Sequence, residues 1–344
     1  MNRTLRLIGV AALAALVAAA PALAARPGGT GPGSAGWLAD QQQTEKFAKT
    51  VPLAKGGAVI VANVSGDITI TGGAGDQVVI DAVKHGKTAD DLKALQIEVT
   101  SAAGRVEIRA QYPRERRNIN ASVDFTITLP RYAQVTVNSV SGDLKLATID
   151  GAARAETVSG DVTVTSAAQL ETAKSVSGDV RVESAGSDTD LTVASVSGDV
   201  TLRGIKARGL DANSISGEVR MTDVTCERLK ASSISGDITF DGPLAKGGRY
   251  ALRSHSGGVT LYTDGKAGFE LNASTFSGDV SSAFELTSKF GGEADRGRPG
   301  QGPRRGPGQR VRGTYGDGGA LVEVDAFSGN VRILNRATAK DIKK

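Results

Sequence analysis

Cysteine, histidine and aromatic residues are scarce in this sequence of 344 residues. It contains one cysteine, Cys226, so it can form neither a disulfide within the chain nor a multi-cysteine zinc site. Two histidines leave little room for histidine-based metal or acid–base chemistry. Lys and Arg number 41 against 37 Asp and Glu, a balance too even to indicate specific binding of nucleic acid.

Glycine is abundant, with 44 residues, while hydrophobic residues make up 40% of the chain and charged residues 23%. This apolar content is enough for a globular core and argues against a chain that is disordered throughout. Aromatic residues reach only 4%, which argues against a helical bundle or an aromatic-rich enzyme core. The composition therefore favours an all-β fold of many short strands joined by tight turns.

The first 24 residues have the three parts of a secretory signal peptide. Arg3 and Arg6 precede an apolar run at 7–20, and a small-x-small sequence ends the segment. The run is shorter than the roughly 20 residues that a membrane-spanning helix needs. We therefore predict cleavage after Ala24 and a secreted mature chain without a transmembrane helix. Residues 25–50, rich in Gly, Pro and Gln, are expected to form a flexible linker.

A Ser-Gly-Asp triplet, or a close variant, recurs along the rest of the chain. Between residues 141 and 277 its copies are 18 to 21 residues apart, a regularity that chance does not produce. Apolar residues alternate with polar ones around each copy, as in strands with one buried face. The triplets begin at Ser65, Ser141, Ser159, Ser177, Ser197, Ser216, Ser235, Ser256, Ser277 and Ser328.

One repeat illustrates the pattern. Its apolar positions are Leu191, Val193, Val196, Val200 and Leu202, and we assign all five to the core. The alternation breaks just before Val196, which predicts a corner of the chain at that point. Each repeat is therefore expected to be a short strand, a corner, a second strand and a linking segment.

A unit of about 19 residues cannot bury its own apolar face, but a stack of such units can. The sequence therefore predicts a β-solenoid over residues 51–335, a parallel β-helix-like stack of ~19-residue coils. An antiparallel sandwich is the competing architecture. It would need tight hairpin signals such as Asn-Gly between the strands, and these do not recur at the right places.

The 76 residues between Ser65 and Ser141 lack the triplet, and we interpret them as an atypical N-terminal capping segment. Residues 291–319, rich in Gly, Arg and Pro, are predicted to be a disordered insert before a closing coil at 320–335. Residues 336–344 form a C-terminal tail. Within the capping segment, Thr88 is a plausible N-cap of a short helix, and strands are expected at 78–83, 96–100, 105–110 and 122–129.

Repeated units of the form [VI]-S-G-[DE]-[VI]-x-[VLF] behind a signal peptide resemble the "putative adhesin" family of bacterial β-strand-repeat domains of unknown function. The likeness extends over roughly Val51 to Asn335. It implies a location in the cell envelope, either the periplasm or the cell surface, and a solenoid-like β fold. The family supplies no catalytic residues that could be transferred to this sequence. The arginine-rich insert departs from the plain repeat.

The glycine of each triplet is expected to keep the inward side of a narrow coil empty. The glycines in question are Gly66, Gly142, Gly160, Gly178, Gly198, Gly217, Gly236, Gly257, Gly278 and Gly329.

The acids that follow these glycines would form a column with about 4.8 Å between neighbours, where like charges repel by about 0.9 kcal/mol even in water. Calcium could relieve this repulsion. Cations beside the column in alternate coils, Lys145, Arg181 and Arg220, offer another remedy, as do bonds from Asp to the local backbone. We favour the structural role, and we predict no metal and no cofactor.

No residue pattern indicates catalysis. His255 occupies a template position that elsewhere holds Val, Ile or Phe, so we predict a half-buried histidine there. Cys226 is a weak candidate nucleophile because its own repeat has no histidine. A polysaccharide lyase or hydrolase built on a β-helix would need clustered charged residues outside the repeat rule and aromatic platforms for sugars. The chain is therefore predicted not to be an enzyme.

The sequence favours an exported, adhesin-like binding or scaffold module of the cell envelope. An accessory sensory or regulatory subunit of an envelope-stress system is the alternative. Partners would be an envelope protein or an anionic surface glycan or lipid, because free arginine side chains suit phosphate and carboxylate groups. The residues predicted to bind such an anionic surface are Arg296, Arg298, Arg304, Arg305, Arg310 and Arg312.

Overall fold

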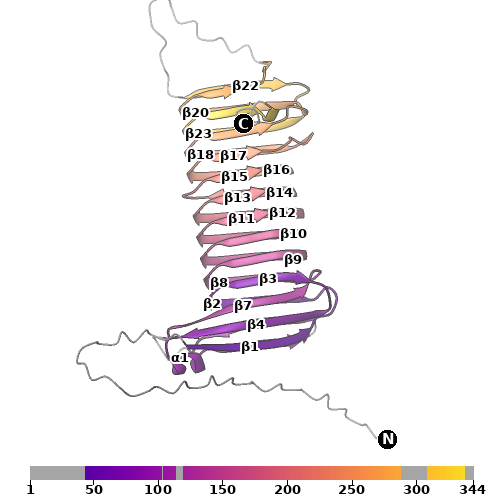
Figure 1. Cartoon of the computed structure of the whole chain (residues 1–344). Helices are drawn as coiled ribbons and strands as arrows, with labels where there is room; N and C mark the ends of the chain where they lie inside the picture. The colour runs from indigo at the N-terminus through magenta and orange to yellow at the C-terminus, as the bar shows by residue number, and fades with distance from the viewer. Residues whose placement is uncertain (1–42, 103, 114–118, 288–307, 338–344) are drawn as a thin grey trace, which may run out of the picture. The chain divides into compact units, whose positions relative to one another are not determined.

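The computed structural model describes residues 43–102, 104–113, 119–287 and 308–337 (Figure 1). In this part of the chain, 24 strands and one short helix account for the regular structure, as the all-β prediction requires. The predicted signal peptide and residues 25–42 of the predicted linker lie outside the described residues. The strand β1 (Gln43–Pro52) begins inside that linker, so the linker prediction is wrong for residues 43–50.

Most of the chain winds into coils that stack on one another through parallel strands. Val180 pairs with Val200, and Val200 with Val219, so that each step to the next coil is one repeat of the sequence. Parallel pairing of this kind excludes the antiparallel sandwich as the arrangement of these repeats. The fold is solenoid-like, and Figure 1 shows the successive coils as parallel arrows.

Each coil contributes to two sheets. The first sheet holds the strand before each triplet, and the second sheet holds the strand after it. In stacking order, the first sheet contains β2 (Ala58–Ser65), β8 (Gln134–Ser141), the ends of β9 (Leu144–Ser159) and β10 (Val162–Ser177), β12 (Gly186–Ser197), β14 (Lys206–Ser214), β16 (Thr225–Ser235), β18 (Arg249–Ser256), β23 (Ala320–Ser328) and β20 (Phe269–Ser277).

The second sheet is built from shorter strands with the same stacking order. It contains β3 (Ile68–Gly73), the beginnings of β9 and β10, β11 (Val180–Glu183), β13 (Val200–Arg203), β15 (Val219–Thr222), β17 (Ile238–Asp241), β19 (Val259–Thr263), β24 (Val331–Asn335) and β21 (Val280–Ser282).

The core lies between these sheets and is filled by the alternating apolar residues of both. Leu191, Val193, Val200 and Leu202 are completely buried in one continuous apolar cluster. Burial of one such side chain stabilises the folded state by about 1.5–3 kcal/mol. The prediction of inward positions is therefore correct for four of the five apolar residues in this repeat.

The fifth position, represented by Val196, was assigned to the wrong side of the strand. Strand β12 runs on to Ser197 without a corner, so Ser195 points inward and Val196 is 38% exposed. Ser195 is tolerated in the core because its hydroxyl donates a hydrogen bond to the carbonyl oxygen of Gly178 at 2.8 Å. The chain turns at the triplet itself, and the prediction of an earlier corner is wrong.

Close contact between coils explains the glycine of the triplet. A Cβ atom added to Gly198 would lie 2.2 Å from the carbonyl oxygen of Gly178 in the preceding coil. The triplet glycines from Gly142 onwards show the same approach, with distances of 2.1–2.3 Å to the glycine of the neighbouring coil. These glycines make room along the stack, which corrects the prediction that they keep the inside of a narrow coil empty.

The acidic residue of the triplet braces the next coil. Asp179 Oδ1 accepts a hydrogen bond from the backbone N–H of Asp199 at 2.9 Å, and Asp161 Oδ1 accepts one from Asp179 at 2.8 Å. The predicted backbone bond of Asp therefore exists, but it reaches the neighbouring coil instead of the local turn. Arg181 and Arg220 form ion pairs with the acids two residues before them, as the cation remedy predicts.

The atypical N-terminal segment covers one end of the stack, as predicted. Its helix α1 (Ala89–Ala94) is capped by Thr88, whose side chain accepts a hydrogen bond from the Asp91 N–H. Strand β7 pairs in parallel with β3, whereas β1 pairs antiparallel with β4, β4 with β7, and β5 with β6. The four strands that the sequence predicted here are β4 (Gln77–Gly86), β5 (Gln96–Ala102), β6 (Arg105–Gln111) and β7 (Ala121–Pro130).

The C-terminal end of the stack departs from sequence order. The coil at 320–335 lies between the coil of β18 and β19 and the coil of β20 and β21. This coil is therefore inserted between two others, and the prediction that it closes the stack is wrong.

Strand β22 (Gln309–Tyr315) pairs antiparallel with β20, so the prediction of a disordered insert is wrong for these residues.

Candidate functional site

The outward apolar residue of each triplet repeat forms a continuous exposed column along the first sheet. The register of the strands places these residues side by side, one from each coil. With about 4.8 Å between neighbouring strands, ten rungs extend over roughly 43 Å. This apolar column consists, in stacking order, of Val64, Val140, Val158, Val176, Val196, Ile215, Ile234, His255, Phe327 and Phe276.

The side chains of the apolar column are more exposed than is usual for a contiguous group of apolar residues. Its nine apolar side chains are between 38% and 52% exposed. Single exposed apolar residues are normal on a protein surface, whereas a contiguous patch indicates contact with a partner. The column is therefore the strongest candidate for a binding surface in the described part of the chain.

Three aromatic rings end the column, and we call His255, Phe327 and Phe276 the aromatic end. The rings of His255 and Phe327 stack at 4.7 Å with 10° between their planes, and those of Phe327 and Phe276 stack at 4.9 Å with 1°. His255 is exposed, so the prediction of a half-buried histidine is wrong. Its ring is held by stacking on Phe327.

A row of small hydroxyl residues forms the floor beside the column. Ser175, Ser195 and Ser254 each donate a hydrogen bond from the side chain to the glycine carbonyl oxygen of the preceding coil. Hollows of about 390 Å³ and 410 Å³ lie over this floor, the first beside Val176 and the second beside Phe327. A partner that packs on the column can therefore also fill the shallow groove beside it.

The charge next to the column changes along its length. Acidic residues follow the Val and Ile rungs at the triplet position, from Asp67 to Asp237. Beside His255 and Phe327 the same position holds Gly258 and Asn330, and Asp279 follows beside Phe276. The aromatic end therefore has fewer acids beside it than the remainder of the column.

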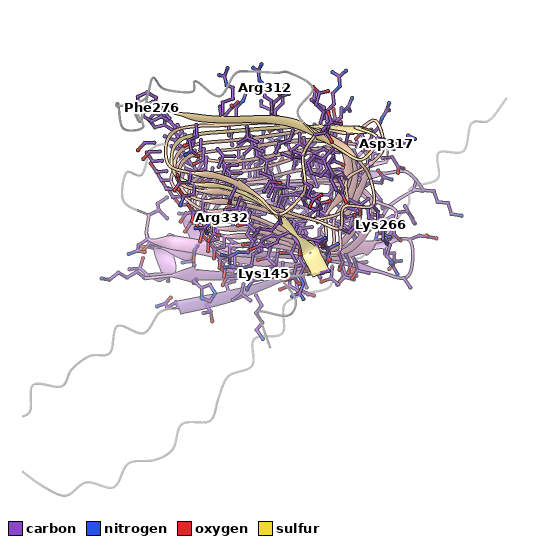
Figure 2. The ribbon with its side chains drawn as sticks, turned by 90° about the horizontal axis from the view of Figure 1, so that it is seen from above. Lys145, Lys266, Phe276, Arg312, Asp317 and Arg332 are labelled. Atoms are coloured by element: carbon purple, nitrogen blue, oxygen red, sulfur yellow. The ribbon has the colours of Figure 1, made fainter. Side chains whose placement is uncertain are left out.

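The structure places two of the six predicted arginines near the aromatic end. Arg310 and Arg312 lie exposed on β22, opposite Ser274 and Asn272 of β20. Figure 2 shows Arg312 along the same sheet as Phe276, whereas Lys145 and Arg332 lie along the other sheet. Arg296, Arg298, Arg304 and Arg305 lie outside the described residues.

The two arginines line a hollow of about 410 Å³ together with Arg253 and Asp325. Arg253 and Asp325 also line the hollow beside Phe327, so the two hollows adjoin. Arg253 Nε lies 3.5 Å from Asp325 Oδ2, whereas Arg310 and Arg312 have no ion-pair partner among the described residues. Free guanidinium groups and an exposed aromatic surface thus lie on neighbouring parts of one sheet.

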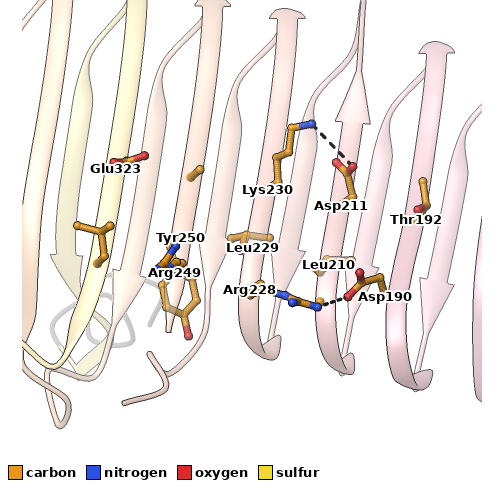
Figure 3. Close-up of a pocket in the computed structure, with 13 residues that line it drawn as sticks. Asp190, Thr192, Leu210, Asp211, Arg228, Leu229, Lys230, Arg249, Tyr250 and Glu323 are labelled. Atoms are coloured by element: carbon orange, nitrogen blue, oxygen red, sulfur yellow. Dashed lines mark hydrogen bonds and ion pairs between the residues drawn. The ribbon is translucent and has the colours of Figure 1, made fainter. Parts of the chain in front are cut away.

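A hollow of about 490 Å³ lies on the first sheet around Arg228, Lys230 and Tyr250. Four of its charged residues form two ion pairs, Arg228 with Asp190 at 2.6 Å and Lys230 with Asp211 at 3.9 Å (Figure 3). Arg249 and Glu323 line the same hollow. Burial raises the pKa of Tyr250 to about 12, and its hydroxyl donates a hydrogen bond to the Cys226 carbonyl oxygen. This hollow holds no arrangement of a nucleophile and a base.

Cys226, the candidate nucleophile of the sequence, is buried. Cys226 is 2% exposed, and burial raises the pKa of its thiol to about 12, so its reactive thiolate form is suppressed. Within the described ranges, no group of three or more His, Cys, Asp or Glu side chains is placed to hold a metal ion. No helix in the same ranges is long and apolar enough to cross a membrane.

The exposed column was missed because its residues are apolar. The available signal was the small or polar residue that precedes each of them, a Ser in six of the ten cases, at the position where strict alternation places an inward residue. A strand that runs straight through this residue puts the following Val, Ile or Phe outside. From the sequence alone, the break in alternation indicates a corner, and a corner at that point places the Val, Ile or Phe in the core.

The solved structures that this chain resembles have low sequence identity to it. A "putative adhesin" from Bacteroides fragilis is 15% identical, with 84% of this chain and 97% of that chain covered and a TM-score of 0.42. A "putative adhesin" and a "putative lipid binding protein", both from Parabacteroides distasonis, are 10% and 8% identical, with TM-scores of 0.40 and 0.33. Both matches cover 84% of this chain. They cover 97% of the adhesin chain and 96% of the lipid-binding chain.

A search of curated proteins finds no match. One family model matches residues 40–189 and again residues 184–285, which together make up most of the chain and most of the stacked coils. The second match begins inside the first, as expected when the same repeated coil fills both segments. On this match the chain belongs to the Toastrack DUF4097 family.

Proposed function

We propose that this protein is an exported, non-catalytic binding module of the cell envelope, in which a β-solenoid holds the apolar column in place for a partner. The observation that carries the proposal is the column itself, in which nine apolar side chains are between 38% and 52% exposed and only His255 interrupts the row. The N-terminal signal sequence supports export to the periplasm or the cell surface. The partner is the lipid surface of the envelope, with which apolar side chains and arginines both interact favourably.

The scaffold is suited to present such a surface. The rung at Val196 illustrates this, because the Ser195 hydroxyl on one side and the triplet acid on the other both bond to the preceding coil. A rigid surface loses little conformational entropy when it binds. The burial of Cys226 supports a module without catalytic activity.

A triple substitution in the middle of the column tests this function. Val158→Thr, Val176→Thr and Val196→Thr keep the branched shape of the side chain but replace one exposed methyl group each by a hydroxyl. At about 25 cal/mol per Å² and about 50 Å² of lost apolar contact per residue, the three cost roughly 4 kcal/mol of binding free energy. We expect retention of the processed protein on its own envelope fraction to fall at least 100-fold.

The matched control changes three outward threonines of the second sheet, Thr163→Ser, Thr201→Ser and Thr239→Ser. These residues lie on the opposite side of comparable coils and are only partly exposed. Retention of the control should equal that of the unchanged protein. Equal retention of the column variant and the control would refute the column as the binding surface.

A further inference from the structure

The two ends of the apolar column differ in ways that matter for a lipid surface. Near Val140 and Val158 the column is flanked by Asp143 and Asp161, which repel an anionic surface. Around His255 and Phe327 the flanking positions are Gly258 and Asn330, which carry no charge. The aromatic end is therefore the part of the column that an anionic surface can approach most closely.

The geometry of the rings favours an acyl chain over a sugar. Phe327 is stacked on His255 on one face and on Phe276 on the other, at 4.7 Å and 4.9 Å. A sugar ring needs an open aromatic face, whereas the exposed part of Phe327, 48% of the side chain, is left to its edge. Ring edges in a row form an apolar ridge that can insert among lipid tails near the headgroups.

Arginine side chains beside the aromatic end can bind the phosphates of lipid headgroups. Arg310 and Arg312 project from β22 into a hollow that adjoins the one beside Phe327, and Arg253 lines both hollows. A guanidinium group binds phosphate oxygens through two parallel hydrogen bonds. Glu323 and Asp325 line the arginine hollow as well, and Asp325 neutralises Arg253. The three arginines and two acids leave the hollow with a net charge of +1, and Arg310 and Arg312 are its guanidinium groups without an ion-pair partner among the described residues.

We propose that the aromatic end and the arginines Arg310 and Arg312 together form a docking site for a bilayer of anionic phospholipid. The Phe edges enter the outer part of the acyl layer, and the guanidinium groups bind headgroup phosphates. This inference rests on the proposed function, because it assigns the lipid contact to one end of the apolar column.

Vesicle flotation with the full processed chain tests the proposal. The probes are vesicles of phosphatidylglycerol and phosphatidylcholine in equal parts, and vesicles of phosphatidylcholine alone. We expect binding to the first, weak binding to the second, and loss of binding at high salt because screening shortens the range of the arginine charges.

Three variants locate the site. Phe276→Ser with Phe327→Ser should lower binding to the anionic vesicles at least tenfold. Arg310→Gln with Arg312→Gln should lower it about 30-fold, since each basic residue near such a surface contributes about 1 kcal/mol. The control is Val79→Ser, an apolar residue that is 37% exposed on β4 and lies outside the apolar column. It should change binding less than twofold.

Several results would overturn the proposal. Equal losses in the control and the aromatic variant would show that the loss of binding is not specific to the aromatic end. Displacement of the protein from vesicles by inorganic phosphate at constant ionic strength would identify a free anion as the ligand. Because every substituted side chain is exposed, unchanged thermal unfolding of each variant confirms that the fold is intact.

The two proposals fail separately. If the Val-to-Thr triple variant loses envelope retention but no form of the protein binds vesicles, the lipid docking site and the lipid partner are wrong, and the column remains the binding surface for another envelope component. If the aromatic end governs vesicle binding but the triple variant keeps full envelope retention, the proposed role of the whole column is wrong.

Discussion

Two neighbouring glycines provide a direct test of why the triplet needs glycine. A Cβ atom on Gly257 would lie 2.3 Å from the carbonyl oxygen of Gly236 in the preceding coil. A Cβ atom on the adjacent Gly258 would meet its nearest atom, the Asn330 carbonyl oxygen, at 3.3 Å. Neither residue has a positive φ, so the two substitutions to Ala differ in the space available and not in backbone strain.

The expected cost follows from the backbone around Gly257. The coil spacing is fixed on both sides, since the Gly236 N–H donates to the Ser256 carbonyl oxygen at 3.1 Å and the Gly257 N–H donates to that of Ser328 at 3.0 Å. Relief of the clash requires a shift of roughly 1 Å against these ladders, and overpacking of this kind costs about 3 kcal/mol. Gly258→Ala should change the free energy of unfolding by no more than about 1 kcal/mol.

Urea unfolding followed by circular dichroism measures the difference between the two variants. For a domain of this size, about 3 kcal/mol corresponds to a fall in Tm of roughly 6–12 °C. Hydrogen exchange should locate the loss of protection at the strands that flank Gly257. Equal stability of Gly257→Ala and Gly258→Ala would refute the steric reasoning for every triplet in the stack.

Three further predictions concern the braces, the thiol and calcium. Ala326 stands where other coils carry a hydroxyl that bonds a glycine carbonyl, so Ala326→Ser should gain about 1 kcal/mol and slow hydrogen exchange between β18 and β23; unchanged exchange would contradict this. Burial raises the pKa of the Cys226 thiol to about 12, so the native protein should not react with a thiol reagent at pH 8. The contribution of the buried thiol to the free energy of unfolding should fall as pH rises from about 9 to 12. Rapid labelling of the native protein would refute the burial. A chelator of calcium should shift the Tm by less than about 2 °C. A fall of more than about 10 °C would show that calcium stabilises the column of triplet acids.

The period-two alternation was sufficient to predict the strands and the side that Leu191 and Val200 face, because burial of an apolar strand face is decided locally. It could not place Val196, because the inward position beside it is filled by a serine whose partner, the Gly178 carbonyl, belongs to another coil. The cap at Thr88 was predictable because its hydrogen bond to Asp91 lies within one turn of helix.

The order of the last coils was not predictable from the repeat. The same template recurs in each coil, so sequence alone does not state that the coil at 320–335 inserts beside β18. The arginines of β22 were identified as a surface feature, but their neighbours were not. Their proximity to Phe327 depends on this insertion, which brings residues more than 70 positions apart into adjacent strands.

Cysteine labelling tests most directly whether the apolar column faces outward to a partner. Native Cys226 is buried, so a second cysteine at Val196 or Ser195 can be followed alone with a maleimide. Val196→Cys should label rapidly in the folded protein and become protected when envelope is added, whereas Ser195→Cys, one residue earlier, should label only after denaturation. Slow labelling of Val196→Cys in the free protein, or no protection by envelope, would contradict the account.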